Sequence, residues 1–252
     1  MKRIYLLMIM MIAALGISAQ SIQEQEFAKA NKYYDENRYD TAVVIYERIL
    51  ADGYESAPLL YNIGNSYFKM RNYPMAILNY EKALKLDPRN EEIRHNLDIA
   101  NSIINDKINP VPEFLLTKWW RSIGNMFSAN GWAVFSLVLF GILLLLIFLY
   151  FTARSRFTKK TSFFAAILLL LVLVCSIILA YQKYDYLNTH NEAIITIPTI
   201  TAKSSPSHTG VDLFVVHEGT KIEILDNTNE WDKIKIADGN IGWLPSSASI
   251  KY

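Results

Sequence analysis

Two long, uninterrupted apolar runs stand out against an otherwise mixed pattern of apolar and polar residues. Residues 132–151 are twenty consecutive residues without a charge, and residues 163–181 form a second uncharged run. A helix rises about 1.5 Å per residue, so each run is long enough for the roughly 30 Å hydrocarbon core of a bilayer. A buried helix of a soluble protein would need polar positions at this length. The pattern therefore predicts two transmembrane helices, at 132–151 and 163–181.

A third and shorter apolar stretch lies at the start of the sequence. Lys2 and Arg3 precede the apolar residues 4–15, and the small residue Ala19 follows them. A basic start, a short apolar segment and a small residue at the exit are typical of a secretory signal peptide. We therefore expect residues 1–19 to be a signal peptide, with an uncleaved anchor as the alternative.

The segment between the two long runs, residues 152–162, sets the expected orientation. It contains no acidic residue and four basic ones, namely Arg154, Arg156, Lys159 and Lys160. Short basic loops stay on the cytoplasmic side of a membrane. The flanking domains then face outward, in agreement with a signal peptide. The prediction is a protein of the bacterial inner (cytoplasmic) membrane with two spans and both soluble domains in the periplasm.

Residues 109–131 lead into the first apolar run. The prolines at the start of this segment predict a stiff linker. The rest, read as a helix, gathers its large apolar side chains on one face: Leu115, Leu116, Trp119, Trp120, Ile123 and Phe127. Lys118 and Arg121 lie on the opposite face, so this helix can lie flat at the membrane surface. The alternative is an extra turn packed on the domain that precedes it.

A repeat occupies the part of the chain before this linker. A shift of 34 residues aligns Tyr33 with Tyr67 and Tyr46 with Tyr80, and a small residue recurs at Ala42 and Ala76. This period and this spacing of small and aromatic residues resemble the tetratricopeptide repeat. The resemblance implies an all-α domain over residues 21–108, with repeats at 22–56 and 57–90 followed by a capping helix.

The resemblance also implies a binding groove for proteins or peptides, because the first helix of each repeat lines the inner surface in this family. The residues at those places are Phe27, Asn31, Tyr34, Tyr61, Asn65, Phe68 and Lys69. Asn31 and Asn65 are equivalent and could hydrogen-bond an extended peptide backbone. The alternative is that these side chains only pack or solvate the repeats. Phe27 stands where relatives that bind a peptide carboxylate carry lysine, which disfavours that ligand.

The pattern changes to short β-branched strands and turns in residues 186–252. Glycines and tryptophans recur there at the places typical of a bacterial SH3-like domain: Gly219, Trp231, Gly239, Gly242 and Trp243. The resemblance implies an all-β SH3-like barrel that binds cell-wall peptides or partner proteins. Trp231 is the candidate for its binding surface, with a place in the core as the alternative.

Charge and candidate chemistry exclude several classes of function. Residues 21–108 hold 11 basic and 14 acidic residues, and residues 186–252 hold 5 and 8, so neither domain has the basic surface of a nucleic-acid-binding protein. The four histidines are scattered, and Cys175 is the single cysteine, inside an apolar run. No phosphate-binding glycine loop or nucleophile motif is present. We expect no enzyme activity, no catalytic or metal site and no cofactor.

The order of these parts defines the fold class: a multidomain membrane protein with an all-α tetratricopeptide domain, two transmembrane helices and an all-β SH3-like barrel. This order resembles the BatE-like proteins of the Bacteroides aerotolerance operon family. The resemblance implies a periplasmic scaffold in an oxygen-tolerance or envelope-stress complex, with membrane-anchored von Willebrand A-type proteins as partners. The alternative is an envelope sensor that binds cell-wall peptides.

Overall fold

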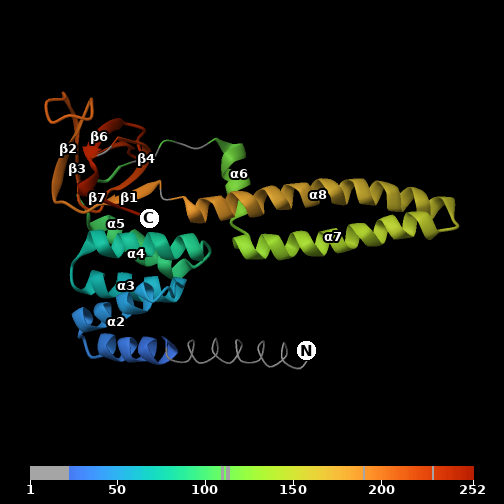
Figure 1. Cartoon of the computed structure of the whole chain (residues 1–252), viewed down its shortest axis with the longest axis horizontal. Coiled ribbons are helices and arrows are strands. Elements are labelled where there is room, and N and C mark those ends of the chain that lie inside the picture. The colour runs from blue at the N-terminus through green and yellow to red at the C-terminus, as the bar shows by residue number, and fades with distance from the viewer. Residues whose placement is uncertain (1–22, 109–110, 112–113, 190, 229) are drawn as a thin grey trace, which may run out of the picture. The chain divides into compact units, whose positions relative to one another are not determined.

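The computed structural model describes residues 23–108, 111, 114–189, 191–228 and 230–252 (Figure 1). The predicted signal peptide lies outside the described residues. The chain divides into two compact units. One unit combines the residues up to Val111 with Asn191–Tyr252, and the other is Pro112–His190.

The first unit begins with antiparallel helices that stack pair upon pair. Residues 23–35 are helical, and four further helices follow: α2 (Tyr39–Ala51), α3 (Ala57–Lys69), α4 (Tyr73–Leu86) and α5 (Glu91–Ile103). Polar side chains start these helices, because a side-chain oxygen can accept a hydrogen bond from a free N–H group of the first turn. Ser56 does this for α3, Asn72 for α4 and Asn90 for α5.

The turn inside each helix pair has the same geometry in both repeats. Asn37 and Arg71, which are 34 positions apart, adopt left-handed φ values of 61° and 63°. After each of them the chain enters the second helix of its pair. The period that was read from side chains is therefore also a period of the backbone.

Close helix contact within the second pair depends on a missing side chain. A Cβ atom at Gly64 would lie 2.6 Å from the ring of Tyr80. Tyr80 and Ala76 are fully buried beside it. The ring therefore fills the space that glycine leaves, as expected for interiors packed at crystal-like density.

The described residues from 191 onward form one antiparallel sheet of seven strands in the order β3-β2-β6-β5-β4-β1-β7. The strands are β1 (Glu192–Ile195), β2 (Thr199–Lys203), β3 (Asp212–His217), β4 (Lys221–Thr228), β5 (Trp231–Lys235), β6 (Ile241–Pro245) and β7 (Ser249–Lys251). Among these residues the edge strands β3 and β7 each pair with one neighbour. The sheet is thus open, and its pairings do not form the closed barrel that was predicted.

The repeats and the sheet share a hydrophobic core. Ile194 of β1 and Tyr252 are buried in the same cluster as Leu60, Tyr80 and Ile93 of the helices. The sequence predicted two separate domains on either side of the membrane segments. In the structure their apolar side chains meet, and the two parts fold as one unit.

The second unit contains α6 (Leu115–Gly124), α7 (Ala129–Thr152) and α8 (Arg156–Asn188). Helices α7 and α8 are both long and apolar enough to cross a membrane. They pack as an antiparallel hairpin through Leu139, Leu143 and Leu173. Both helices extend beyond the apolar runs. Three of the four basic residues expected in a loop therefore lie in the first turns of α8: Arg156, Lys159 and Lys160.

Candidate functional site

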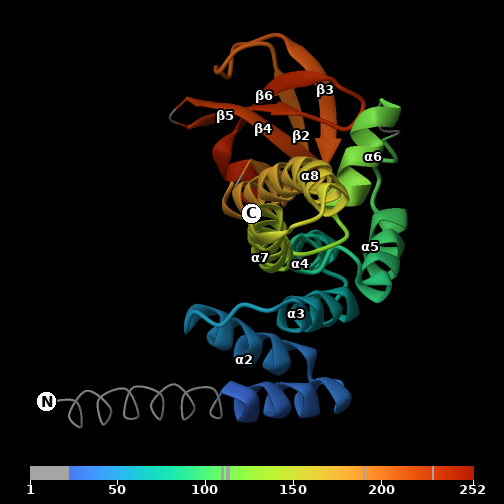
Figure 2. The ribbon, with the colours of Figure 1, turned by 90° about the vertical axis from the view of Figure 1, so that its right-hand side faces the viewer.

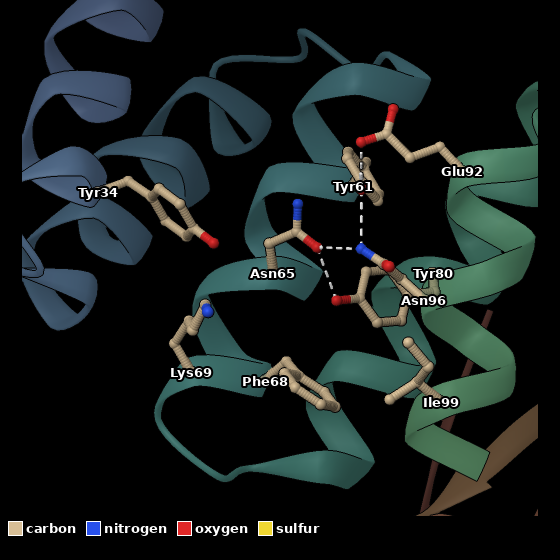
Figure 3. Close-up of a pocket in the computed structure, with 9 residues that line it drawn as sticks. All are labelled: Tyr34, Tyr61, Asn65, Phe68, Lys69, Tyr80, Glu92, Asn96 and Ile99. Carbon is tan, nitrogen blue, oxygen red and sulfur yellow. Dashed lines mark hydrogen bonds between the residues drawn. The ribbon is translucent and has the colours of Figure 1, made fainter. Parts of the chain in front are cut away.

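A pocket of about 350 Å³ opens on the inner face of the helical repeats (Figure 3). Its size is at the lower end of the range for ligand pockets, enough for one or two side chains of a peptide. Side chains from the first helix of each successive pair form most of its wall. The lining residues are Tyr34, Tyr61, Asn65, Phe68, Lys69, Tyr80, Glu92, Asn96 and Ile99.

Asn65 lies at the centre of the pocket wall and is held by two hydrogen bonds. Its amide oxygen accepts one from the hydroxyl of Tyr80 at 2.7 Å and one from the amide nitrogen of Asn96 at 3.0 Å. A carbonyl oxygen has two lone pairs, so both are used. The amide nitrogen points away from these two bonds in Figure 3. Asn65 can therefore offer a ligand N–H donors, but not its oxygen.

The first repeat contains the same arrangement one period earlier. The amide oxygen of Asn31 accepts hydrogen bonds from the Tyr46 hydroxyl at 2.6 Å and from the amide nitrogen of Asn62 at 3.0 Å. Each asparagine thus links the two helices of its own pair, and it also links them to the first helix of the next pair. The prediction that Asn31 and Asn65 contact a peptide is untested, but the structure gives both residues a role in the helix stack.

Tyr61 and Glu92 form the wall at one end of the pocket. The Tyr61 hydroxyl donates to a carboxylate oxygen of Glu92 at 2.8 Å and accepts from the amide nitrogen of Asn96 at 2.8 Å. Burial and the hydrogen bond to Glu92 raise the pKa of Tyr61 to about 12. Its hydroxyl therefore stays protonated near neutral pH and acts as a fixed polar group.

The opposite end of the pocket carries a positive charge. Lys69 follows Tyr61 by eight positions on α3, which is roughly 12 Å along a helix axis. The apolar side chains of Phe68 and Ile99 lie toward the Lys69 end in Figure 3, and Ile99 is 40% exposed. The pocket therefore combines a cationic end with apolar side chains beside it, a middle lined by amide groups, and an anionic end.

Five of the seven groove residues predicted from the sequence line this pocket, and two lie elsewhere. Tyr34, Tyr61, Asn65, Phe68 and Lys69 come together there. Asn31 lies in the first repeat, where its amide oxygen accepts hydrogen bonds from Tyr46 and Asn62. Phe27 packs against the Tyr46 ring, with ring centroids 5.7 Å apart.

The prediction missed four lining residues: Tyr80, Glu92, Asn96 and Ile99. Part of the signal was present in the repeat period. Ile99 follows Asn65 by one period, so continuing the alignment into α5 would have identified it. Asn96 follows Asn62, which was not among the predicted groove residues. Helix α5 thus takes the place of the first helix of a further repeat, and it also caps the stack.

Trp231, the predicted surface residue of the sheet, is nearly buried. Its exposed fraction is 9%, and the ring of His208 packs edge-on against it with centroids 5.0 Å apart. Little of this ring is therefore open to a ligand. Within the described part of the chain, no group of three or more His, Cys, Asp or Glu side chains could hold a metal ion.

Comparison with known proteins identifies the helical part. The tetratricopeptide repeat family matches residues 57–90, the second of the two predicted repeats. A comparison with curated proteins finds no match to the chain. Tetratricopeptide repeats form concave surfaces that bind other proteins. The matched repeat contributes most of the pocket wall, so binding of a protein or peptide is the class of function indicated for this part of the molecule.

Proposed function

We propose that this protein is a membrane-anchored adaptor whose repeat pocket binds a short extended segment of a partner protein. The observation that carries the proposal is the pocket itself, formed on the first-helix face of a matched tetratricopeptide repeat. Its wall offers N–H donors from Asn65 to peptide carbonyl groups. The Tyr61 hydroxyl, partly buried and hydrogen-bonded to Glu92, stays protonated near neutral pH and adds a fixed polar group to this wall.

The charge distribution of the pocket defines the segment it would bind. The ends marked by Lys69 and Tyr61 are roughly 12 Å apart, a distance that about four residues of extended chain would cover. An acidic side chain would pair with Lys69 and a basic one with Glu92. A small or branched apolar side chain next to the acidic one would contact Phe68 and Ile99.

Anchoring is proposed to come from α7 and α8. Both helices would cross the bacterial inner membrane, with the basic residues Arg154, Arg156, Lys159 and Lys160 on the cytoplasmic side. The repeats and the sheet would then both lie in the periplasm. Their shared core supports this placement, because the residues before α7 and those after α8 can form one folded unit only on the same side of the membrane.

The cellular role is proposed from the resemblance to the BatE-like family. An adaptor of this kind would join membrane-anchored von Willebrand A-type proteins in an oxygen-tolerance or envelope-stress complex. The sheet would correspond to the SH3-like part of those proteins. Neither a cofactor nor an enzymatic reaction is part of the proposal.

Site-specific photo-crosslinking in native membranes tests the adaptor function. A photoreactive phenylalanine analogue replaces Phe68 in the pocket, and a matched control replaces Val44, which is 58% exposed on the second helix of the first pair. We expect one dominant partner adduct at position 68, and its loss when Ile99→Arg is added. Mass spectrometry of the adduct should identify a segment with an acidic residue near the crosslink. Equal adducts at both positions, or adducts at position 44 only, would refute the pocket as the binding site.

The alternative, a sensor of cell-wall peptides, would place the ligand on the sheet. Burial of Trp231 beneath His208 disfavours this site. Because the sheet shares its core with the repeats, the test should use the full chain in detergent rather than an isolated fragment. Retention of the full chain on intact sacculi, with no crosslink at position 68, would favour the sensor.

A further inference from the structure

Helix α6 exposes almost its entire apolar face. Its residues advance about 100° per position, which places the large apolar side chains in one sector and Lys118 and Arg121 in the other. The exposed fractions are 72% for Leu115, 67% for Leu116 and 67% for Trp119. Burying large apolar side chains is favourable, so a contiguous exposed face of this kind indicates a surface that something covers.

Three hydrogen bonds attach α6 to the ends of the helical hairpin. The indole N–H of Trp120 donates to Gln182 of α8 at 2.9 Å. Directly after α6, the side-chain oxygen of Asn125 accepts from Lys183 of α8 at 2.8 Å. The indole of Trp132, at the start of the apolar run of α7, donates to the carbonyl of Gly124 at 2.9 Å. These contacts place α6 at the level where both apolar runs end.

The direction of α6 differs from that of the hairpin. In Figure 1, α6 runs across α7 and α8, and in Figure 2 the hairpin is seen end-on while α6 lies in the plane of the view. If α7 and α8 cross a bilayer, a helix that runs across their direction at this level lies along the membrane surface.

We infer that α6 lies in the boundary between the headgroups and the acyl chains of the periplasmic leaflet, and that phospholipid covers its apolar face. Two observations favour lipid over a protein partner. The first turns of α7, which follow α6 in the chain, also expose apolar side chains, among them Val134 and Leu137. Lys118 and Arg121 occupy the sector that would face the phosphates, as in other interfacial helices. The inference rests on the proposed membrane anchoring.

Spin labels on the full chain in phosphatidylethanolamine and phosphatidylglycerol vesicles test this placement. Cys175→Ala removes the native thiol, and single cysteines are then introduced at Leu116 on the apolar face, at Ser122 on the polar face, and at Ile142 near the middle of α7. Oxygen reports contact with lipid, and a water-soluble nickel complex reports contact with water. We expect the Leu116 label to contact oxygen several-fold more than nickel, about 5–10 Å below the headgroups. The Ser122 label should show the reverse.

Each other result has a definite meaning. Nickel contact at both Leu116 and Ser122, with Ile142 in lipid, would overturn the inference, because α6 would then lie in water. Shielding of Leu116 from both reagents would also overturn it, because protein would then cover the helix. Nickel contact at Ile142 would refute the membrane span itself. The placement of α6 would in that case be decided by the contrast between Leu116 and Ser122 alone.

Discussion

The carboxylate of Asp106, which follows the last repeat helix, accepts a hydrogen bond from the main-chain N–H of His217 at the end of β3, 2.7 Å away. The same carboxylate lies 2.7 Å from the ring nitrogen Nδ1 of His217 and accepts from the hydroxyl of Thr220 at 2.7 Å. A single side chain from the repeats thus contacts three polar groups where β3 ends and β4 begins. This side chain joins two parts of the sequence that lie on either side of the two long apolar helices.

Replacement of Asp106 should destabilise the repeats and the sheet together. Asp106→Ala removes a charged acceptor whose side chain is 14% exposed, and leaves the N–H of His217 and the hydroxyl of Thr220 without it. Hydrogen bonds to charged groups contribute about 1.5–3 kcal/mol each in favourable cases, so we expect a loss of roughly 2–4 kcal/mol in the free energy of unfolding. Denaturant unfolding of the full chain in detergent measures it. Asp98→Ala, at an exposed position on α5, is the control and should change the stability by less than about 0.5 kcal/mol.

The same carboxylate predicts a loss of stability in acid. Burial would raise the pKa of Asp106, but the hydrogen bonds from Thr220 and His217 outweigh it and lower the pKa. A lowered pKa in the folded state means that the stabilisation is complete above the unfolded value of about 3.9 and is lost as the pH falls through the folded value. The stability difference between the native chain and Asp106→Asn should therefore shrink below about pH 4. A difference that stays constant from pH 6 to pH 3 would contradict this assignment.

Gly219, between β3 and β4, should not accept a larger residue. Its φ is +86°, and an added Cβ would lie 2.6 Å from Ile104 and 3.3 Å from Ile77. Gly219→Ala therefore combines the cost of a left-handed backbone, about 1 kcal/mol, with overpacking that typically costs about 1–3 kcal/mol. Gly53 separates the two terms, because it has the same φ of +86° with no atom within 4 Å of the added Cβ. Thermal unfolding should show a clearly larger loss for Gly219→Ala than for Gly53→Ala, and equal losses would contradict the close contact with Ile104.

Asn65 is expected to matter for stability even without a ligand. Asn65→Leu removes the acceptor of the Tyr80 hydroxyl inside the stack, and an unsatisfied buried polar group costs about 1–3 kcal/mol. The equivalent change Asn31→Leu should have a similar effect through Tyr46. Restoring part of the loss by Tyr80→Phe in the Asn65→Leu background would confirm the cause. If Tyr80→Phe adds a further loss of its own, the hydrogen bond is not what the asparagine contributes.

Local patterns were sufficient for the elements of this fold but not for its long-range contacts. Asn65, Phe68 and Lys69 are three and four positions apart on one predicted helix, so helix geometry alone identifies them as neighbours on one face. The pairing of Asp106 with His217 spans 111 positions. No periodicity relates them, and each reads alone as an ordinary surface residue.

The merging of two predicted domains was hidden for the same reason. Lys221 of β4 lies 2.9 Å from Glu81 of α4 and 3.0 Å from Glu192 of β1. The attraction of these carboxylates outweighs the cost of burial and raises the pKa of Lys221, so the lysine stays charged between them. From the sequence alone, these three charged residues would be expected on the solvent-exposed surface. Only the approach of the sheet to α4 brings them together as a partly buried ionic cluster.

One polar contact joins the two long apolar helices of the hairpin, and we expect it to contribute little to their association. The hydroxyl oxygens of Ser136 on α7 and Ser176 on α8 lie 2.8 Å apart. Each can also donate to a carbonyl of its own helix, Ser136 to Trp132 and Ser176 to Leu173, both at 2.8 Å. Removing one hydroxyl therefore leaves the other satisfied, and a double-mutant cycle with Ser136→Ala and Ser176→Ala should give a coupling of only about 0.6 kcal/mol. Unfolding of the full chain in detergent measures it. A coupling above about 2 kcal/mol would exceed what such hydrogen bonds contribute and would require a further interaction between the two helices at this point.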